Sequence, residues 1–230
     1  VGTLDLALEQ KARRAVESAF GQYLNAEMVA RLADDPGLLR LGGESRDMTV
    51  LFSDIRGFTS MSEKGTPEDV VAQLNELFTR MVAVVFDHRG TVDKFVGDMI
   101  MALYGAPLDD DDHADHAVQT ALAMIRTLQE MTGQWQAQGK PTLDIGIGVN
   151  TGDMVAGNIG SDTIMSYTVI GDAVNLGARL ESLNKDYATR IIISEFTRAR
   201  LKGQYDIHPL GEVVVKGKTR PVAIFEVKST

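Results

Sequence analysis

Short apolar runs divide the chain into segments with alternating strand and helix patterns. The apolar run Met48–Phe52 predicts a buried strand that ends near Asp54. Thr91–Phe95 and Met99–Tyr104 predict two further strands, and the Gly-Asp pair between them predicts a tight turn. The segment Leu143–Asn150 alternates between apolar residues and small or polar ones, which predicts a half-buried strand.

Two segments of helical spacing follow clear start signals. Thr66 predicts an N-cap, and Pro67 suits the first helical position after it. The acidic run Asp109–Asp112 precedes a second helix. The first helix is expected to face inward at Val70, Leu74, Leu77, Phe78, Met81, Val82 and Val85, and the second at Ala117, Ala121, Met124 and Leu128.

Weaker patterns account for the rest of the chain. Leu4–Leu32 predicts an N-terminal helix, and its apolar stripe fits a helix packed on its own domain as well as one that links two subunits. A helix is also predicted from Asp172, as its cap, to Asn184. Further strands are predicted at Asp153–Ile159, Tyr167–Ile170, Ile191–Ile193, Glu212–Lys216 and Ala223–Val227.

The order of these elements predicts the fold class. Strand, helix, two strands, helix and strand together are typical of an α/β (α+β) sandwich, in which helices cover one mixed sheet. We assign residues 47–230 to this domain. Residues 1–46 are predicted to be a helix and linker to an upstream regulatory region, with Leu41–Ser45 in the linker.

Composition and charge narrow the possible functions. The formal net charge of −9 argues against a general nucleic-acid-binding surface. The chain has no cysteine, which excludes disulfides and thiolate metal sites and suits a cytoplasmic location. No apolar run approaches the ~20 residues that span a bilayer, so we expect no direct membrane contact from this segment. Because residue 1 is valine, we expect a longer protein whose N-terminal region could carry a membrane anchor.

Two aspartates are the strongest candidates for chemistry. Asp54 follows the first predicted strand, and Asp98 lies in the turn between the next two. Either one alone would be interpreted as a turn residue. Together, carboxylates at neighbouring strand ends can hold a pair of hard cations against a polyphosphate. Gly57 lets the backbone approach a phosphate, so the amides of Phe58 and Thr59 are candidate phosphate donors. The pattern predicts metal-assisted nucleotidyl transfer.

Three segments resemble the signatures of the class III nucleotidyl cyclases. They are F-S-D-I-R-G-F-T around Asp54, D-K-F-V-G-D around Asp98, and I-G-D-A-V-N-L-G-A-R-L-E, which contains Asn175 and Arg179. The resemblance extends over roughly Asp47–Val227 and keeps the order of the family's motifs. It implies a ferredoxin-like palm core and an adenylyl cyclase catalytic domain.

The resemblance also implies a reaction and an assembly. ATP would be converted to 3′,5′-cyclic AMP and pyrophosphate with two Mg²⁺ or Mn²⁺ ions per site, bound by Asp54, Asp98 and the Ile55 carbonyl. One ion would lower the pKa of the ribose 3′-hydroxyl, and the other would neutralise the β- and γ-phosphates. A head-to-tail homodimer would form two shared sites, each with the two aspartates of one chain facing the remaining site residues of the other.

Those remaining site residues are expected to bind the phosphates and the ribose. Asn175 and Arg179 are four residues apart, so they share one helix face. By the resemblance, Arg179 would stabilise the α-phosphate in the transition state, and Asn175 would orient the ribose. Lys216, with Lys218 as the alternative, would reach the terminal phosphates.

Lys94 and Thr168 are expected to contact the base. In this family, the residue four positions before the second metal-binding aspartate is Lys in adenylyl cyclases and Glu in guanylyl cyclases. A Lys or Thr donor suits adenine N1, whereas a Glu acceptor suits the N1–H and amine of guanine. Thr168 stands where adenylyl cyclases usually have Asp. This departure resembles the bicarbonate-responsive bacterial subgroup, so bicarbonate is expected as a possible regulator.

Two alternative functions stay open from the sequence. A guanylyl cyclase would keep the metal site, but Lys94 argues against it. A non-catalytic dimerisation or nucleotide-sensing module would typically lack the metal aspartates or the Asn/Arg pair, and both are present here. Asp109–Asp112 with His113 and His116 could suggest a separate metal site, but we interpret the cluster as a solvated acidic helix start.

Overall fold

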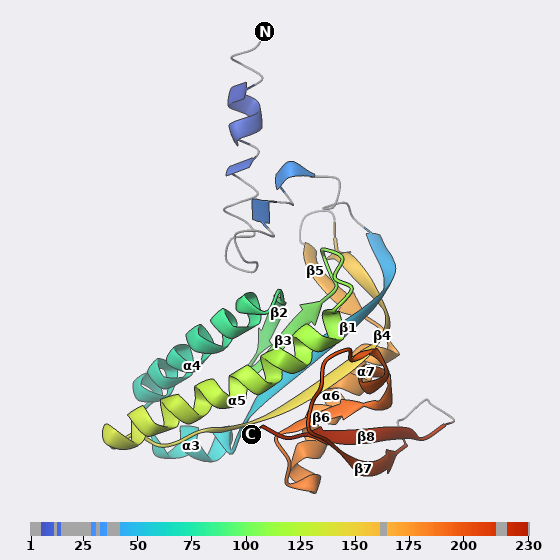
Figure 1. The fold of residues 1–230 in the computed structure, drawn as a ribbon. Helices are drawn as coiled ribbons and strands as arrows, with labels where there is room; N and C mark the ends of the chain where they lie inside the picture. The colour runs from blue at the N-terminus through green and yellow to red at the C-terminus, as the bar shows by residue number, and fades with distance from the viewer. Residues whose placement is uncertain are drawn as a thin grey trace.

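The computed structural model is organised around an eight-stranded sheet (Figure 1). It describes residues 42–161, 165–214 and 220–229, together with residues 6–11, 13–14, 29–30 and 33–35. The strand order is β2-β3-β1-β4-β6-β8-β7, and β5 pairs with β4 outside this path. Neighbouring strands are antiparallel except β4 and β6, which are parallel.

The strands and helices of the domain alternate along the chain. The strands are β1 (Gly42–Arg56), β2 (Thr91–Val96), β3 (Met99–Tyr104), β4 (Asp144–Gly160), β5 (Met165–Ile170), β6 (Ile191–Ser194), β7 (Ile207–Val213) and β8 (Val222–Val227). The helices are α3 (Phe58–Lys64), α4 (Pro67–Asp87), α5 (His113–Ala137), α6 (Asp172–Tyr187) and α7 (Glu195–Arg200).

The first four strands form the ferredoxin-like core that the sequence predicts. The elements β1, α4, β2, β3, α5 and β4 follow one another as βαββαβ, and their strands lie in the order β2-β3-β1-β4. β6, β8 and β7 extend the sheet beyond β4. The prediction of a mixed sheet with helices packed on it is confirmed.

Helices cover both faces of this sheet. α4 and α5 lie side by side over one face, where the core contains Leu51, Met124 and Trp135 (Figure 1). α6 packs over the other face, against Val50 and Phe52 of β1. Because successive residues of β1 enter opposite cores, the strand is buried on both faces, which explains its continuous apolar run.

Two glycines bring α6 close to the sheet. A Cβ on Gly148 of β4 would lie 2.2 Å from the backbone nitrogen of Glu181, and a Cβ on Gly177 of α6 would lie 2.8 Å from Val50 Cγ2. A side chain on Gly148 would push α6 away from β4, and one on Gly177 would push it away from β1. The close packing places one face of α6 over the end of β1 that carries Asp54, since Asp54 pairs with Gly146 of β4.

Several predicted boundaries are confirmed. Thr66 caps α4, because its Oγ1 accepts a hydrogen bond from the Asp69 amide at 3.2 Å, and Pro67 opens the helix. The turn between β2 and β3 lies at residues 97 and 98, with Gly97 at a φ of 62°. The acidic run ends where α5 begins, at His113.

Other boundaries differ from the prediction. Gly42–Ser45 pair with β4, so their interpretation as linker is wrong. The sequence predicts a half-buried strand at Leu143–Asn150 and a separate one after it. The structure has one strand, β4, whose small-residue face is covered by α6. Its glycines therefore mark close packing rather than exposure to solvent.

Differences also occur at the helices and near the C-terminus. Gly171 occupies the cap of α6, so Asp172 is its first residue and not its cap. The sequence analysis omits α3 and α7, each of which is less than about two turns long. The strand predicted at Glu212–Lys216 overlaps β7 only at Glu212 and Val213, and its last two residues lie outside the described ones.

The N-terminal helix predicted over Leu4–Leu32 falls mostly outside the described residues. Those that are described within this range, residues 6–11, 13–14 and 29–30, are helical. Across the described parts of the chain, no helix combines the length and the hydrophobicity that a membrane crossing requires.

Candidate active site

Asp54 and Asp98 meet at one end of the central strands. Asp54 lies near the end of β1, and Asp98 lies in the β2–β3 turn. Ser53 of β1 pairs with Ile100 of β3, so the register brings the turn alongside Asp54. The two carboxyl groups lie near enough for Asp98 to raise the pKa of Asp54.

This arrangement disfavours the charged form of Asp54. Burial and the neighbouring Asp98 carboxylate raise the pKa of Asp54 to about 6, against the opposing effect of the Ile55 amide. That amide donates to Asp54 Oδ1 at 3.0 Å. Two carboxylates that repel each other in a half-buried site fit a divalent cation, whose charge would remove the repulsion.

The donor set matches hard cations but is small. In the described residues, no group of three or more His, Cys, Asp or Glu side chains is arranged to hold a metal. Two aspartates would therefore need additional oxygen ligands, such as a backbone carbonyl and the phosphates of a substrate. A polyphosphate substrate would supply such ligands.

Glu181 is a third carboxyl group near this pair, and the sequence analysis does not identify it. It lies on α6, is 5% exposed, and a Cβ on Gly146 would lie 2.9 Å from its Oε1. Burial, followed by the charge of Asp54, raises the pKa of Glu181 to about 7, while Lys185 and Arg56 oppose this shift. Its only sequence signal is its place at the end of the L-G-A-R-L-E segment, and that alone does not place it near Asp54.

We expect Glu181→Gln to stabilise the metal-free protein at pH 8 and to lose this advantage toward pH 4.5. A carboxyl group whose folded pKa is about 7 against an ordinary 4.5 destabilises the fold increasingly as pH rises through that interval. The neutral amide removes this effect. Thermal melts with a chelator at several pH values measure it, and an equal change in melting temperature at pH 5 and pH 8 would contradict the assignment.

Lys94 and Thr168 lie together beside a buried carboxylate. Thr168 Oγ1 of β5 donates to Asp93 Oδ2 at 2.8 Å, and Lys94 Nζ lies 3.9 Å from Asp93 Oδ1. The Lys94 side chain is 47% exposed, whereas that of Asp93 is 1% exposed. The structure thus brings the two predicted base-contacting residues to one place and adds a third residue, Asp93.

Asn175 and Arg179 are both exposed on α6. They lie one helical turn apart, as their spacing predicts. Within the described residues, the Arg179 guanidinium has no ion pair or hydrogen bond. A permanently charged group held on a rigid helix without a partner is available to an anionic ligand.

The remaining predicted site residues are those around the turn after Asp54 and the C-terminal lysines. Gly57 has a φ of 68°, and α3 begins immediately after it at Phe58, with Thr59 exposed. The amides predicted to bind phosphate therefore lie at a sharp turn directly after Asp54. Ile55 is buried within β1. Lys216 and its alternative Lys218 lie outside the described residues.

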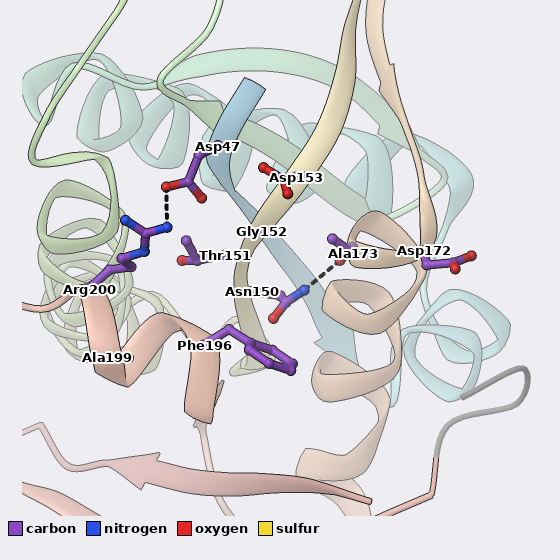
Figure 2. Close-up of a pocket in the computed structure, with 10 residues that line it drawn as sticks. All are labelled: Asp47, Asn150, Thr151, Gly152, Asp153, Asp172, Ala173, Phe196, Ala199 and Arg200. Carbon is purple, nitrogen blue, oxygen red and sulfur yellow. Dashed lines mark hydrogen bonds and ion pairs between the residues drawn. The ribbon is translucent and has the colours of Figure 1, made fainter. Parts of the chain in front are cut away.

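A pocket between β1, β4, α6 and α7 is a separate feature. Figure 2 shows this cavity of about 460 Å³, lined by residues of β1, β4, α6 and α7. Asp47 and Arg200 form an ion pair of 2.6 Å on one side, and Asn150 donates to the Ala173 carbonyl at 2.7 Å on the other. Asp47 precedes Asp54 by seven residues of β1, or roughly 23 Å. None of the predicted site residues lines this pocket.

The acidic start of α5 is engaged in local contacts. Asp110 accepts from His116 Nδ1 at 2.7 Å, and Asp112 pairs with Lys202 at 2.6 Å. Asp109 pairs with Arg46 at 2.8 Å. The interpretation of a solvated helix start holds only in part, because the Asp110 side chain is 9% exposed, whereas those of Asp109 and Asp112 are exposed.

Comparisons with known proteins support the same family. The model of the adenylate and guanylate cyclase catalytic domain matches residues 43–228. Adenylate cyclase 1 of Rhizobium meliloti is 35% identical over 227 residues, which are 99% of this chain and 34% of that protein. The adenylate cyclase of Anabaena cylindrica is 36% identical over 80% of this chain and 37% of its own length. The chain thus spans about a third of the length of these two relatives.

Solved structures of both specificities resemble the domain. The guanylyl cyclase Cya2 is 43% identical, with a TM-score of 0.73, over 81% of this chain and 94% of that one. The adenylyl cyclase CyaB from P. aeruginosa is 39% identical, with a TM-score of 0.76, over 83% of this chain and 97% of that one. With the βαββαβ core, the paired aspartates and these matches, the chain belongs to the class III adenylate and guanylate cyclase catalytic domains.

Proposed function

We propose that this domain is an adenylyl cyclase that converts ATP to 3′,5′-cyclic AMP and pyrophosphate. The observation that carries the proposal is the proximity of Asp54 to Asp98 on a domain that also presents Asn175 and Arg179. Degenerate cyclase-like modules would lack one of these two sets. The names of the Rhizobium and Anabaena relatives and of CyaB support the choice of ATP.

The aspartate pair is proposed to hold two Mg²⁺ or Mn²⁺ ions together with the Ile55 carbonyl. When bound, these ions lower the pKa of the ribose 3′-hydroxyl and neutralise the β- and γ-phosphates. The fold holds the two carboxyl groups near each other, although burial and their mutual repulsion both disfavour the charged form of Asp54. A bound cation would offset both effects. The turn at Gly57 supplies backbone amides for the phosphates at the same strand end.

The other half of the site is proposed to orient and stabilise the substrate. Arg179 would donate a fork of hydrogen bonds to the α-phosphate as negative charge develops, and Asn175 would hold the ribose. Lys216 is proposed to bind the terminal phosphates. Lys94 and Thr168 are proposed to contact the adenine ring.

We propose that two chains form a head-to-tail homodimer with two shared sites. Val96 of β2 is 51% exposed and Ile170 of β5 is 54% exposed. These strands also carry Lys94 and Thr168, so apolar side chains border the proposed base site. Exposed apolar side chains grouped around polar ones are typical of a surface that a partner covers. The unpaired Arg179 also fits a site that the single chain leaves incomplete.

A guanylyl cyclase is the second candidate, favoured by the 43% identity to Cya2. The two candidates are separated by turnover of ATP and GTP at equal concentrations with Mg²⁺ or Mn²⁺. We expect cyclic AMP as the main product, because Lys94 is a donor that suits the unprotonated N1 of adenine. Cyclic GMP as the main product would overturn the proposed specificity, and no product from either nucleotide would favour a non-catalytic module.

Bicarbonate is proposed as a regulator only because Thr168 replaces the aspartate that is usual in adenylyl cyclases. A titration at fixed pH and ionic strength, with chloride as the control, tests this point. We expect the maximal rate to rise, and a flat response would remove bicarbonate from the account.

A further inference from the structure

We propose that Asp93 is a positioning residue for base selection, which fixes the Thr168 hydroxyl as a hydrogen-bond acceptor toward the base and so favours adenine over guanine. The inference rests on the proposed function, in which Lys94 and Thr168 contact the base. It assigns a role to Asp93, the first residue of the D-K-F-V-G-D segment, which has none in the proposed function.

The position of Asp93 depends on an irregularity in β2. Val92 pairs with Ala102 and Lys94 pairs with Met101, so Asp93 is the extra residue of a β-bulge. A bulge re-aims side chains relative to a regular strand. The Asp93 side chain is 1% exposed and reaches both Thr168 and Lys94, at 2.8 Å and 3.9 Å. A regular strand would send Asp93 and Lys94 to opposite faces.

The contact with Thr168 has a defined direction. An ionised carboxylate accepts hydrogen bonds and donates none, so the hydrogen in this contact belongs to the Thr168 hydroxyl. Burial raises the pKa of Asp93, and the hydrogen bond from Thr168 and the charge of Lys94 oppose this by favouring the carboxylate. The two residues that oppose the effect of burial are therefore the two that are proposed to contact the base.

This direction has a consequence for the substrate. A Thr hydroxyl has one hydrogen and two lone pairs, and Asp93 takes the hydrogen. Only lone pairs are then left for the base, so Thr168 acts here as an acceptor, and Lys94 alone is left as the donor to adenine N1. The amine at position 6 of adenine is a donor and suits such an acceptor, whereas guanine presents a carbonyl oxygen there. Lys94 also favours adenine, because its ammonium group is a donor and N1 is an acceptor in adenine but a donor in guanine.

A purely structural role is the competing explanation. β5 pairs only with β4 in the described sheet, so the hydrogen bond between Thr168 and Asp93 also connects β5 to β2. Loss of this hydrogen bond would lower stability and total activity with both nucleotides. It would leave the ratio of kcat/KM for ATP to kcat/KM for GTP unchanged, and this ratio is the readout that separates the two roles.

The test uses the isosteric variant Asp93→Asn and a matched pair at position 168. We expect Asp93→Asn to lower the ATP-to-GTP ratio on the order of 10-fold, because the new amide nitrogen can donate to Thr168 Oγ1 and so leave the Thr168 hydrogen free to donate to the guanine carbonyl. Thr168→Ser should keep the wild-type ratio, and Thr168→Val should reduce it. In the Thr168→Val background, Asp93→Asn should change the ratio no further, since Asp93 acts through the hydroxyl.

The position-168 pair keeps the inference testable even if the Asp93 variant does not fold. Equal ratios for Thr168→Ser and Thr168→Val would overturn it, as would an unchanged ratio in folded Asp93→Asn. The inference would also be contradicted if Asp93→Asn lowered the ATP-to-GTP ratio further in the Thr168→Val background. If the wild-type domain prefers GTP or turns over neither nucleotide, the proposed function itself fails. If the wild type prefers ATP but the variants keep its ratio, only the role of Asp93 fails.

Discussion

Asp54→Asn and Asp98→Asn are each expected to abolish turnover while the metal-free protein stays folded. The amide keeps the volume of the side chain but removes the charge that would bind the cations. Burial and the repulsion from Asp98 together raise the pKa of Asp54 to about 6, and loss of a charge from the pair should relieve the repulsion. The melting temperature in chelator at pH 8 is therefore expected to equal or exceed that of the wild type.

The combination of lost activity and retained stability distinguishes a metal-binding role from a folding role. Asp87→Asn is the matched control, because Asp87 is an exposed carboxylate at the end of α4 and lies away from the β2–β3 turn. It should keep full activity. Substantial turnover by Asp54→Asn or Asp98→Asn at saturating Mn²⁺ would remove that aspartate from the metal site, and a large fall in its melting temperature would indicate a structural role.

Arg179→Ala is expected to lower kcat on the order of 10²–10³-fold with a smaller effect on KM, as for loss of one preorganised donor to the transition state. Arg179 is exposed and has no partner among the described residues, so its loss should leave the melting temperature unchanged. Arg179→Lys keeps the charge but lacks the planar guanidinium. Its kcat should therefore lie between those of the wild type and Arg179→Ala.

Arg126 offers a matched control, since it is an exposed arginine on α5. Arg126→Ala should keep wild-type kcat. If Arg179→Ala also kept it, or raised only KM, Arg179 would not stabilise the transition state. Steady-state kinetics with ATP, and the thermal melts already described, decide between these outcomes.

Sequence patterns predict the core of this fold well because it depends on local signals. The strand Met99–Tyr104 and the start of α4 have the predicted bounds, since a Gly-Asp turn and a Thr-Pro cap act within a few residues. The spacing of Asn175 and Arg179 on one helix face is also local. Contacts between distant segments were harder to predict.

The missed features depend on tertiary packing. The glycines of β4 suggest an exposed face, but they exist because α6 lies against them, and sequence alone does not place α6 there. Asp93 precedes the predicted Lys94, yet only the bulge in β2 and the approach of Thr168 from β5 give it a partner. Glu181 becomes notable only when α6 brings it near Asp54.

The central claim is that each active site is shared between two chains, and mixing two inactive variants tests it most directly. Asp54→Asn and Arg179→Ala would be combined under conditions of verified subunit exchange. In a mixed dimer, one site carries both changes and the other carries neither. With random pairing, half of the dimers are mixed and each has one intact site of two, so activity should recover to about a quarter of wild type.

A matched mixture provides the control for this measurement. Asp54→Asn mixed with Asp98→Asn places one change in each of the two sites, so no intact site forms and no recovery is expected. Recovery with Arg179→Ala but not with Asp98→Asn is the result that the account predicts. If both mixtures stay as inactive as the separate variants, Asp54 and Arg179 do not serve one site from opposite chains, and the shared-site account is contradicted.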